Sequence, residues 1–193
     1  MELRKSRLFY LVSVLAVIAF FLVLYVYADN SGDRSEYPGN GRDVTARQAY
    51  EMWDSDPDNV IILDVRTTEE YAQFGHPPMA YNIPFAILVG ESDLSKRNYT
   101  MRQNPDFLKS VEKRFSREDT ILLLCRSGQR SGVAENILRN AGFSNVHNIA
   151  DGFEGNPPQG TTRMSKGRGA INGWKNSGAP WTYKIDPNRV YTP

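Results

Sequence analysis

Short apolar runs alternate with helix-like stretches along the middle of the chain. Runs rich in apolar residues, bounded by polar turns, predict buried strands at 60–63, 81–84, 120–124 and 145–149. Apolar residues at helical spacing predict helices over 46–53, 68–74, 107–115 and 133–140. This order predicts an α/β domain with a mainly parallel central sheet flanked by helices. In such a domain the functional loops lie at the carboxyl ends of the strands.

Local signals support the boundaries of these elements. Thr45 with Gln48, and Thr67 with Glu70, have the spacing of capping boxes, each of which opens a helix. The face predicted to be apolar in the last helix carries Val133, Ala134, Ile137 and Leu138. Residues 94–103 are polar and are predicted to form a loop.

The N-terminus has a different pattern. Residues 8–27 contain no charged residue and follow Arg4, Lys5 and Arg7. About 20 apolar residues suffice to cross a bilayer as one N-terminal hydrophobic helix. A run longer than the ~7–15 apolar residues of a cleaved signal peptide favours an uncleaved anchor, although residues 26–28 would also suit cleavage. We therefore predict a signal peptide or signal anchor over 1–28, with the basic end in the cytoplasm.

This topology predicts a location for the rest of the protein. An uncleaved anchor gives a single-pass protein of the cell membrane, attached through residues 8–27, with the folded domain on the outer, periplasmic or extracellular, side. Cleavage gives a periplasmic or secreted protein.

The other segments are divided by composition. Residues 29–42 are predicted as a flexible linker, 43–185 as the domain and 186–193 as a loose tail. An insertion at 156–170 interrupts the domain. From 155 to 185 the chain has no acidic residue and five basic ones, Arg163, Lys166, Arg168, Lys175 and Lys184. This stretch is either a basic lid that gathers an anion or a solvated surface loop, and the sequence leaves both open.

Composition excludes several classes of function. A formal net charge of +1 argues against a general nucleic-acid binder. The single cysteine cannot form an intramolecular disulfide, and with only two histidines it cannot supply a usual zinc site. His76 lies in a predicted turn and His147 in a predicted strand. We expect no metal and no organic cofactor.

The candidate chemistry lies at residues 125–131, Cys-Arg-Ser-Gly-Gln-Arg-Ser. They follow a predicted strand and precede a predicted helix, an arrangement that points backbone N–H groups and a helix dipole at one spot. The thiol of Cys125 should ionise readily there, because the amides, Arg126 and Arg130 favour an anion. A lone cysteine after a buried strand is often an inert core residue. Two arginines, two serines and a glycine are poor core material, which favours a reactive thiol.

The length of this loop separates two chemistries. Four residues lie between Cys125 and Arg130, whereas a phosphate-handling loop of the tyrosine-phosphatase kind has five. The smaller cradle suits one added sulfur atom better than a phosphate. The motif Cys-Arg-x-Gly-x-Arg-Ser resembles the active-site loop of rhodanese-family sulfurtransferases. Motifs at 63–66, 70–71, 75–78 and 82–84 resemble the N-terminal half of a rhodanese domain, with a departure at 77–80.

The resemblance implies a rhodanese-like domain that moves sulfane sulfur from a small anionic donor such as thiosulfate to a thiol or cyanide acceptor. Cys125 is then the catalytic nucleophile and carries the sulfur as a persulfide. The candidate substrate-binding residues are Arg126, Ser127, Gly128, Gln129, Arg130, Ser131 and Arg66.

Three of the site residues have expected structural roles. Ser131 is expected to begin the following helix and to cap it. Asp64 is predicted to give structural support, either by accepting bonds from the loop amides or by capping the next turn. Arg66 either lines the pocket or pairs with Asp64.

Two rival functions remain. A non-catalytic rhodanese-like binding or sensing module at the membrane is the main alternative, although inactive copies usually lose the cysteine. A phosphatase or arsenate reductase is disfavoured by the loop length and by the lack of an identifiable Asp general acid. The sequence names no protein partner.

Overall fold

The structure is a computed structural model that describes residues 43–89, 100–155 and 172–192. All of them belong to the compact unit Pro38–Pro193. The predicted N-terminal segment 1–28, the linker 29–42 and the insertion 156–170 lie outside the described residues, so these interpretations stay predictions. Among the helices that the structure describes, none is both long and apolar enough to cross a bilayer.

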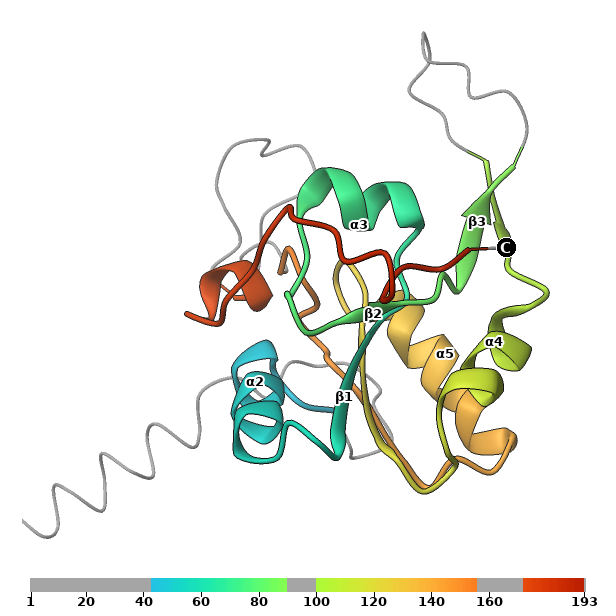
Figure 1. Cartoon of the computed structure of the whole chain (residues 1–193), viewed down its shortest axis with the longest axis horizontal. Coiled ribbons are helices and arrows are strands. Elements are labelled where there is room, and N and C mark those ends of the chain that lie inside the picture. Colours follow the sequence, from blue (N-terminus) through green and yellow to red (C-terminus); the bar gives the residue numbers. More distant parts are fainter. Residues whose placement is uncertain (1–42, 90–99, 156–171, 193) are drawn as a thin grey trace, which may run out of the picture. The chain divides into compact units, whose positions relative to one another are not determined.

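The core of the fold is the predicted parallel sheet. Its strands are β1 (Val60–Asp64), β2 (Tyr81–Asn82), β5 (Thr120–Leu124) and β6 (Asn145–Asn148), in the spatial order β2-β1-β5-β6 (Figure 1). Every neighbouring pair is parallel, and Asp64 lies opposite Leu124 in the register of β1 and β5. The chain that leaves β1 is therefore next to the chain that leaves β5, where Cys125 follows.

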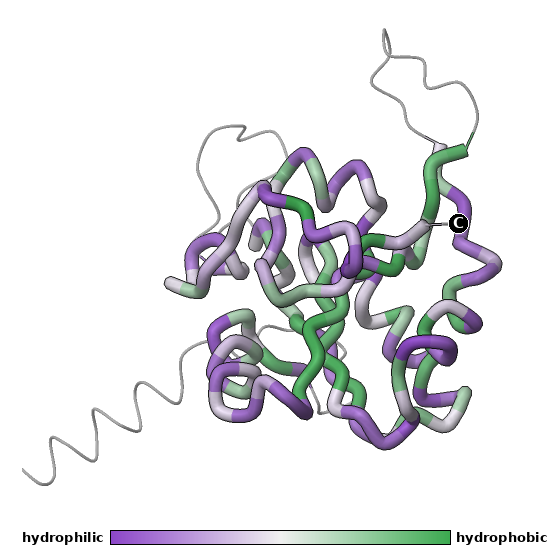
Figure 2. Tube along the Cα trace, in the orientation of Figure 1, coloured by the Kyte–Doolittle hydropathy of each residue, from purple (hydrophilic) through white to green (hydrophobic). Residues whose placement is uncertain are grey.

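Helices cover both faces of this sheet. They are α2 (Ala46–Ser55), α3 (Thr68–Phe74), α4 (Phe107–Arg114), α5 (Gln129–Asn140) and a short 3-10 helix, η1 (Trp174–Asn176). Alternate residues of the strands enter two separate apolar clusters. One cluster includes residues of α4 and α5, and the other includes residues of α2, α3 and η1. Figure 2 shows the hydrophobic positions gathered along the central strands.

Both predicted capping boxes are present. The side chains of Thr45 and Thr67 each accept a hydrogen bond from the N–H of the third helical residue, and the side chains of Gln48 and Glu70 accept one from the backbone N–H of the cap residue. These caps fix where α2 and α3 begin, and so position the turns that precede them at the carboxyl edge of the sheet.

Two predictions of secondary structure are wrong. Part of the segment predicted as a loop forms β4 (Met101–Gln103), which pairs antiparallel with β3 (Ala86–Leu88). Helix α5 begins at Gln129, with Gly128 at the N-cap in a left-handed conformation, so Ser131 lies in the first turn and does not cap it. The helix presents Ser131 and Glu135 to the interior with Ala134 and Leu138, while Val133 is 51% exposed.

The C-terminal segment was predicted as a loose tail, and this is also wrong for residues 186–192. The N–H of Asn82 in β2 donates to the carbonyl of Arg189 at 2.7 Å. The Arg189 guanidinium donates to the carbonyl of Met79, and Val190 and Tyr191 pack against the two apolar clusters. The segment covers the edge strand β2, which would otherwise expose unpaired backbone groups.

Candidate active site

Cys125 lies immediately after β5, at the carboxyl edge of the sheet. It is held on both sides, because the N–H of Val65 donates to the carbonyl of Leu124 and the N–H of Phe153 to that of Cys125, both at 2.8 Å. The side chain is 1% exposed and borders an apolar cluster. Strands β1 and β6 lie on either side of β5. A reactant can therefore approach Cys125 from the side of the loop that follows β5.

The loop after Cys125 presents a series of backbone donors. Within the part of the chain that the structure describes, no hydrogen bond uses the N–H of any residue from 126 to 131 as its donor. These groups belong to the turn and to the first residues of α5, where helix geometry provides no partner. Successive free N–H groups at a helix start form a concave site that favours an anion.

Ser131 places a hydroxyl beside the sulfur. Its Oγ lies 3.2 Å from both the Sγ of Cys125 and the carbonyl oxygen of Gly128, and the residue is fully buried. The single hydroxyl hydrogen can be donated to either acceptor. A thiolate would attract it, because a hydrogen bond to an ionised acceptor is stronger than one to a neutral one.

Close backbone packing fixes the shape of the loop. Gly128 has φ 82°, and a Cβ there would lie 2.0 Å from the carbonyl oxygen of Ala150. A Cβ on Gly152 would lie 2.6 Å from the backbone of Arg126. The loop and the turn after β6 are therefore in contact with no room for side chains, which explains glycine at both positions.

We expect Gly128→Ala to destabilise the protein by roughly 2–4 kcal/mol, since it adds a clash to an unfavourable φ. Urea unfolding measures the loss. Gly178→Ala is a matched control, because Gly178 has φ 84° but its Cβ would meet nothing within 4 Å. The control should lose about 1–2 kcal/mol. Equal losses at the two sites would show that the loop is not held against Ala150.

Arg130 faces back toward α3, where it meets Glu70. Its Nη1 and Nη2 donate to the two carboxylate oxygens at 2.6 and 2.7 Å, and both side chains are about one-fifth exposed. Burial lowers the pKa of Arg130, but the hydrogen bonds and charge of Glu70 raise it above its usual value overall. The charge of an ionised Cys125 acts in the same direction. Arg130 is therefore a cation held in place by Glu70, and its charge interacts with that of an ionised Cys125.

Glu70 has two tasks in this arrangement. Its Oε2 also accepts the backbone N–H of Thr67 at 3.0 Å, which completes the capping box of α3. Burial raises the pKa of Glu70, but the hydrogen bonds and charge of Arg130, with the Thr67 N–H, bring it below 4.5. Sequence reasoning found the cap but missed the pairing with Arg130, 60 positions away.

The lowered pKa of Glu70 predicts a pH dependence. Its ionised form contributes stability that is complete above its ordinary pKa of 4.5 and is lost as the pH falls through the lower folded-state value. Glu70→Gln should therefore cost roughly 1–2 kcal/mol at pH 7 and much less at pH 3. Urea unfolding at the two pH values tests this. Glu69→Gln, one position away on the exposed side of α3, should show no such difference.

Asp64 and Arg66 form a second ion pair beneath the site. Both are fully buried, with Arg66 Nη2 2.6 Å and Nε 3.0 Å from the Asp64 carboxylate oxygens. Asp64 also accepts the backbone N–H of Arg66, so it caps the turn after β1 rather than binding the loop amides. The Arg66 guanidinium lies 4.1 Å from the ring centre of Phe153. Of the two alternatives for Arg66, the structure shows pairing with Asp64, and a direct role in donor binding stays a prediction.

The remaining predicted residues lie around the rim. The Arg126 side chain is 64% exposed and pairs with Glu154 at 2.9 Å. Gln129 is exposed and Ser127 is half-buried. His76 is buried away from the loop, with ring nitrogens near the carbonyls of Tyr71 and Lys184. The structure thus gathers Cys125, Ser131, Arg130 and Glu70, and leaves the exposed loop residues to meet a ligand from outside.

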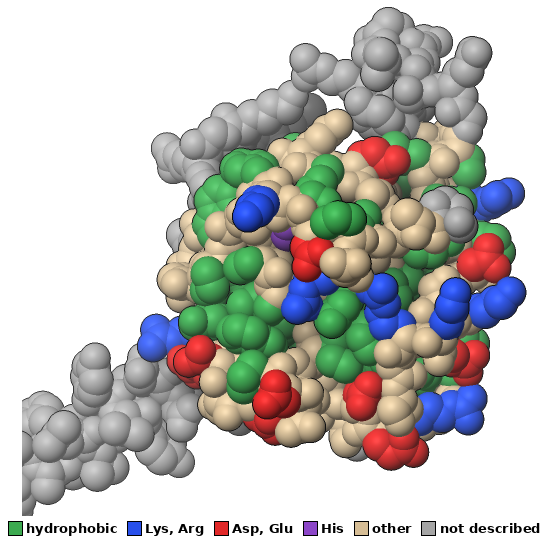
Figure 3. All heavy atoms as spheres, in the orientation of Figure 1, with side chains coloured by type: hydrophobic (Ala, Val, Ile, Leu, Met, Phe, Trp, Pro, Cys, Tyr) green, Lys and Arg blue, Asp and Glu red, His purple; other side chains and the backbone are tan. Residues whose placement is uncertain are grey.

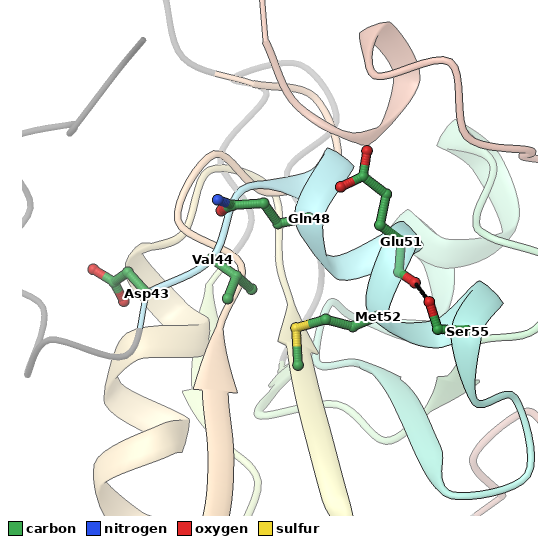
Figure 4. Close-up of a pocket in the computed structure, with 6 residues that line it drawn as sticks. All are labelled: Asp43, Val44, Gln48, Glu51, Met52 and Ser55. Atoms are coloured by element: carbon green, nitrogen blue, oxygen red, sulfur yellow. Dashed lines mark hydrogen bonds between the residues drawn. The ribbon is translucent and has the colours of Figure 1, made fainter. Parts of the chain in front are cut away.

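A surface hollow of about 430 Å³ lies along α2 (Figure 4). None of the predicted site residues lines it; its lining residues are Asp43, Val44, Gln48, Glu51, Met52 and Ser55. Among the described residues, no three His, Cys, Asp or Glu side chains gather as metal ligands would. The hollow therefore gives no competing candidate for the chemistry.

Comparison with known proteins decides the family. The family profile of the rhodanese-like domain matches residues 45–155. The chain belongs to the rhodanese-like family. This confirms the resemblance read from the cysteine loop, and the α/β fold agrees with it.

Individual relatives of this rhodanese-like chain carry further information. It is 43% identical to the chloroplastic thiosulfate sulfurtransferase 16 of Arabidopsis thaliana over 91 residues, which are 47% of this chain and 68% of that protein. It is 33% identical to the uncharacterized protein RC0915 of Rickettsia conorii over 142 residues, 74% of this chain and 98% of that protein. The crystal structure of Rv0390 from M. tuberculosis superposes with a TM-score of 0.57 at 29% identity, covering 74% of this chain and 97% of that one. The family and the similarity to the Arabidopsis sulfurtransferase support a sulfurtransferase-type role, whereas the names of the other two proteins state no activity.

Proposed function

We propose that this rhodanese-like protein is a sulfurtransferase that carries sulfane sulfur on Cys125. The observation that carries the proposal is the surroundings of the sulfur. Ser131 Oγ lies 3.2 Å from it, and the backbone donors of residues 126–131 have no acceptor among the described residues. A persulfide anion would accept from such donors, as an oxyanion does in other enzymes.

The proposed cycle has two steps. The Cys125 thiolate attacks the outer sulfur of thiosulfate, the sulfur–sulfur bond of thiosulfate breaks, and sulfite leaves with the bonding electron pair. An acceptor thiolate or cyanide then attacks the outer sulfur of the persulfide. The bond to Sγ breaks, and Cys125 is released as a thiolate while a new persulfide or thiocyanate departs. Neither step needs a metal or an organic cofactor.

Fixed charges near the loop suit an anionic donor. Arg130 is held by Glu70 and acts on the sulfur from inside the site, whereas Arg126 stands at the exposed rim. We propose that Arg126 attracts the donor and that Arg130 stabilises the charge on the reacting sulfur atoms.

One observation favours the non-catalytic alternative. The Cys125 side chain is 1% exposed, as expected for a core cysteine in a binding or sensing module. A sulfurtransferase with this geometry must admit the donor through the loop.

The experiment that separates these functions measures the intact mass of the full-length chain, kept in a mild detergent because residues 8–27 are apolar. After incubation with thiosulfate we expect a gain of one sulfur atom. Cyanide should remove it and yield thiocyanate. No gain would favour the binding module, and turnover of an aryl phosphate without a gain would favour a phosphatase.

The location of the protein is a separate proposal. We propose that residues 8–27 hold the protein at the cell membrane with the domain outside, or direct its export, on the support of the uncharged apolar run alone. The mass of the protein isolated from cells, compared with that of the full chain, distinguishes the anchor from a cleaved signal.

A further inference from the structure

A row of aromatic rings leads from Phe153 to the surface. The N–H of Phe153 donates to the carbonyl of Cys125, and its buried ring meets Trp181 edge-on, with centroids 6.3 Å apart. Trp181 in turn meets Tyr183 at 5.4 Å. Each contact has the edge-to-face geometry that aromatic pairs prefer. The surface around Trp181 and Tyr183 is therefore packed against Phe153, whose backbone is hydrogen-bonded to that of Cys125, although the Phe153 ring and the Cys125 side chain belong to different apolar clusters.

The outer end of this row is exposed and held in place. Trp181 is 39% exposed and Tyr183 58% exposed. Thr182 between them exchanges two backbone hydrogen bonds with His76, at 2.8 and 2.9 Å, which anchor this stretch to the turn after α3. Trp181, Tyr183 and Ile185 each leave part of an apolar side chain exposed along this stretch, which bends at Tyr183.

The neighbouring residues extend this surface. Ile185 is 45% exposed, and Phe74, next to the Gly75 that packs against Trp181, is 46% exposed. In Figure 3 apolar side chains surround a basic one where the C-terminal segment runs beside α3. Rigid, exposed aromatic residues of this kind are enriched where proteins bind other proteins.

The charge of this surface is positive. The Lys175 ammonium lies 4.7 Å from the ring centre of Trp181 and 5.2 Å from that of Phe153. Among the described residues, neither Lys175 nor Lys184 pairs with a carboxylate. The acidic groups at either end of the segment already have partners, since Glu154 binds Arg126 and Asp186 lies 3.5 Å from Arg189.

We propose that this aromatic–lysine surface, formed by Phe74, Lys175, Trp181, Tyr183, Lys184 and Ile185, docks the protein that accepts sulfur from Cys125. The partner would carry its cysteine on an acidic segment with apolar side chains, which match the lysines and the rings. The proposal rests on the proposed function and names the acceptor class for the same site. A small thiol would need no such area, and Phe153, on which Trp181 packs, donates its backbone N–H to the carbonyl of Cys125.

The transfer step balances without another reactant. The partner's thiol loses its proton to solvent, and the thiolate attacks the outer sulfur of the Cys125 persulfide. A sulfur–sulfur bond forms on the partner, the bond to Sγ breaks, and its electron pair returns Cys125 to the thiolate. The partner leaves as a persulfide.

The test compares two synthetic peptides of equal length that hold one cysteine between apolar residues, one flanked by Glu and Asp and the other by Lys. Two quantities are measured with the full-length chain. The first is the affinity for versions with serine in place of cysteine, which does not depend on sulfur chemistry. The second is the rate at which the cysteine peptides take sulfur from the Cys125 persulfide. It is divided by the rate at which cyanide takes sulfur from the same variant.

We expect the acidic peptide to bind and react roughly tenfold better than the basic one. Lys175→Glu should remove or reverse this preference, and Tyr183→Ala should weaken binding of the acidic peptide several-fold. Lys109→Glu on α4 and Met101→Ala are matched controls at exposed positions elsewhere, and they should keep the wild-type ratio.

The outcomes separate the two proposals. Equal affinities for the two peptides, or a preference that Lys175→Glu and Tyr183→Ala leave unchanged, would overturn the docking surface. If both variants weaken binding to phosphatidylglycerol vesicles but not to the acidic peptide, the surface binds lipid and the proposal is wrong. A binding preference in a protein whose Cys125 never gains sulfur would support the surface and count against the sulfurtransferase.

Discussion

Replacing Cys125 by serine is expected to abolish the gain of sulfur from thiosulfate and to lower thiocyanate formation on the order of 10³-fold or more. The hydroxyl is almost the same size as the thiol but is not ionised near neutral pH. It also cannot form the sulfur–sulfur bond on which the proposed cycle depends. Intact mass and the rate of thiocyanate release measure the two effects.

A second substitution tests whether the loss of activity is caused by misfolding. Cys125 is 1% exposed and borders an apolar cluster, so placing the more polar serine hydroxyl there costs roughly 1–3 kcal/mol. Cys125→Ala avoids the buried hydroxyl and should unfold at a urea concentration closer to that of the wild type. Both variants should fail to gain sulfur. Sulfur uptake by a folded alanine variant would contradict the assignment of the nucleophile.

Burial of the thiol also bears on how the reaction would proceed. The sulfur lies among apolar residues on the strand side, and the free N–H groups lie on the loop side. In the proposed cycle, a sulfur atom added to Cys125 would accept hydrogen bonds from these donors. This arrangement suits a persulfide better than it suits a simple core cysteine, whose surroundings need no polar partner.

The parts of the fold that the sequence predicts are those set by local signals. The capping boxes at Thr45 and Thr67 mark the starts of α2 and α3, and the runs at β1 and β5 are buried on both faces and so read as continuous apolar segments. The order of these elements is enough to place Cys125 at the carboxyl edge of the sheet.

The parts that the sequence missed depend on contacts between distant residues. The β3–β4 hairpin and the docking of Arg189 on Asn82 bring together segments whose own residues give no clear pattern. The early start of α5 depends on the left-handed Gly128, whose conformation is imposed by contact with Ala150. Local spacing cannot report such contacts.

The candidate site divides in the same way. The order of residues 125–131 predicts the cysteine loop, because the loop is continuous in sequence. The partner of Arg130 could not be predicted, since Glu70 already had an apparent role as the third residue of a capping box. Arg66 lies two positions after Asp64 in the chain, and only the structure, in which both side chains are buried, distinguishes pairing with Asp64 from a place in the pocket.

Replacing Arg130 by alanine is expected to lower kcat/KM for thiosulfate by roughly 10²–10³-fold, the usual effect of removing one fixed charge from a reacting centre. Two causes act together. The cation that stabilises the reacting sulfur is lost, and Glu70 is left as a half-buried carboxylate without its partner. Initial rates at several thiosulfate concentrations measure the change.

Further variants separate these two causes. The double variant Arg130→Ala with Glu70→Gln removes the unpaired carboxylate and should recover part of the lost rate. The kcat/KM of Arg130→Lys should fall between those of the wild type and the alanine variant, because an ammonium keeps the charge but cannot bind both oxygens of Glu70 in parallel.

A matched control is Arg117→Ala, which removes an exposed arginine paired with Glu112 and should leave the rate unchanged. The charge of Arg130, unlike that of Arg117, is expected to act on Cys125. Equal losses of kcat/KM for Arg117→Ala and Arg130→Ala would therefore mean that Arg130 has only a structural role.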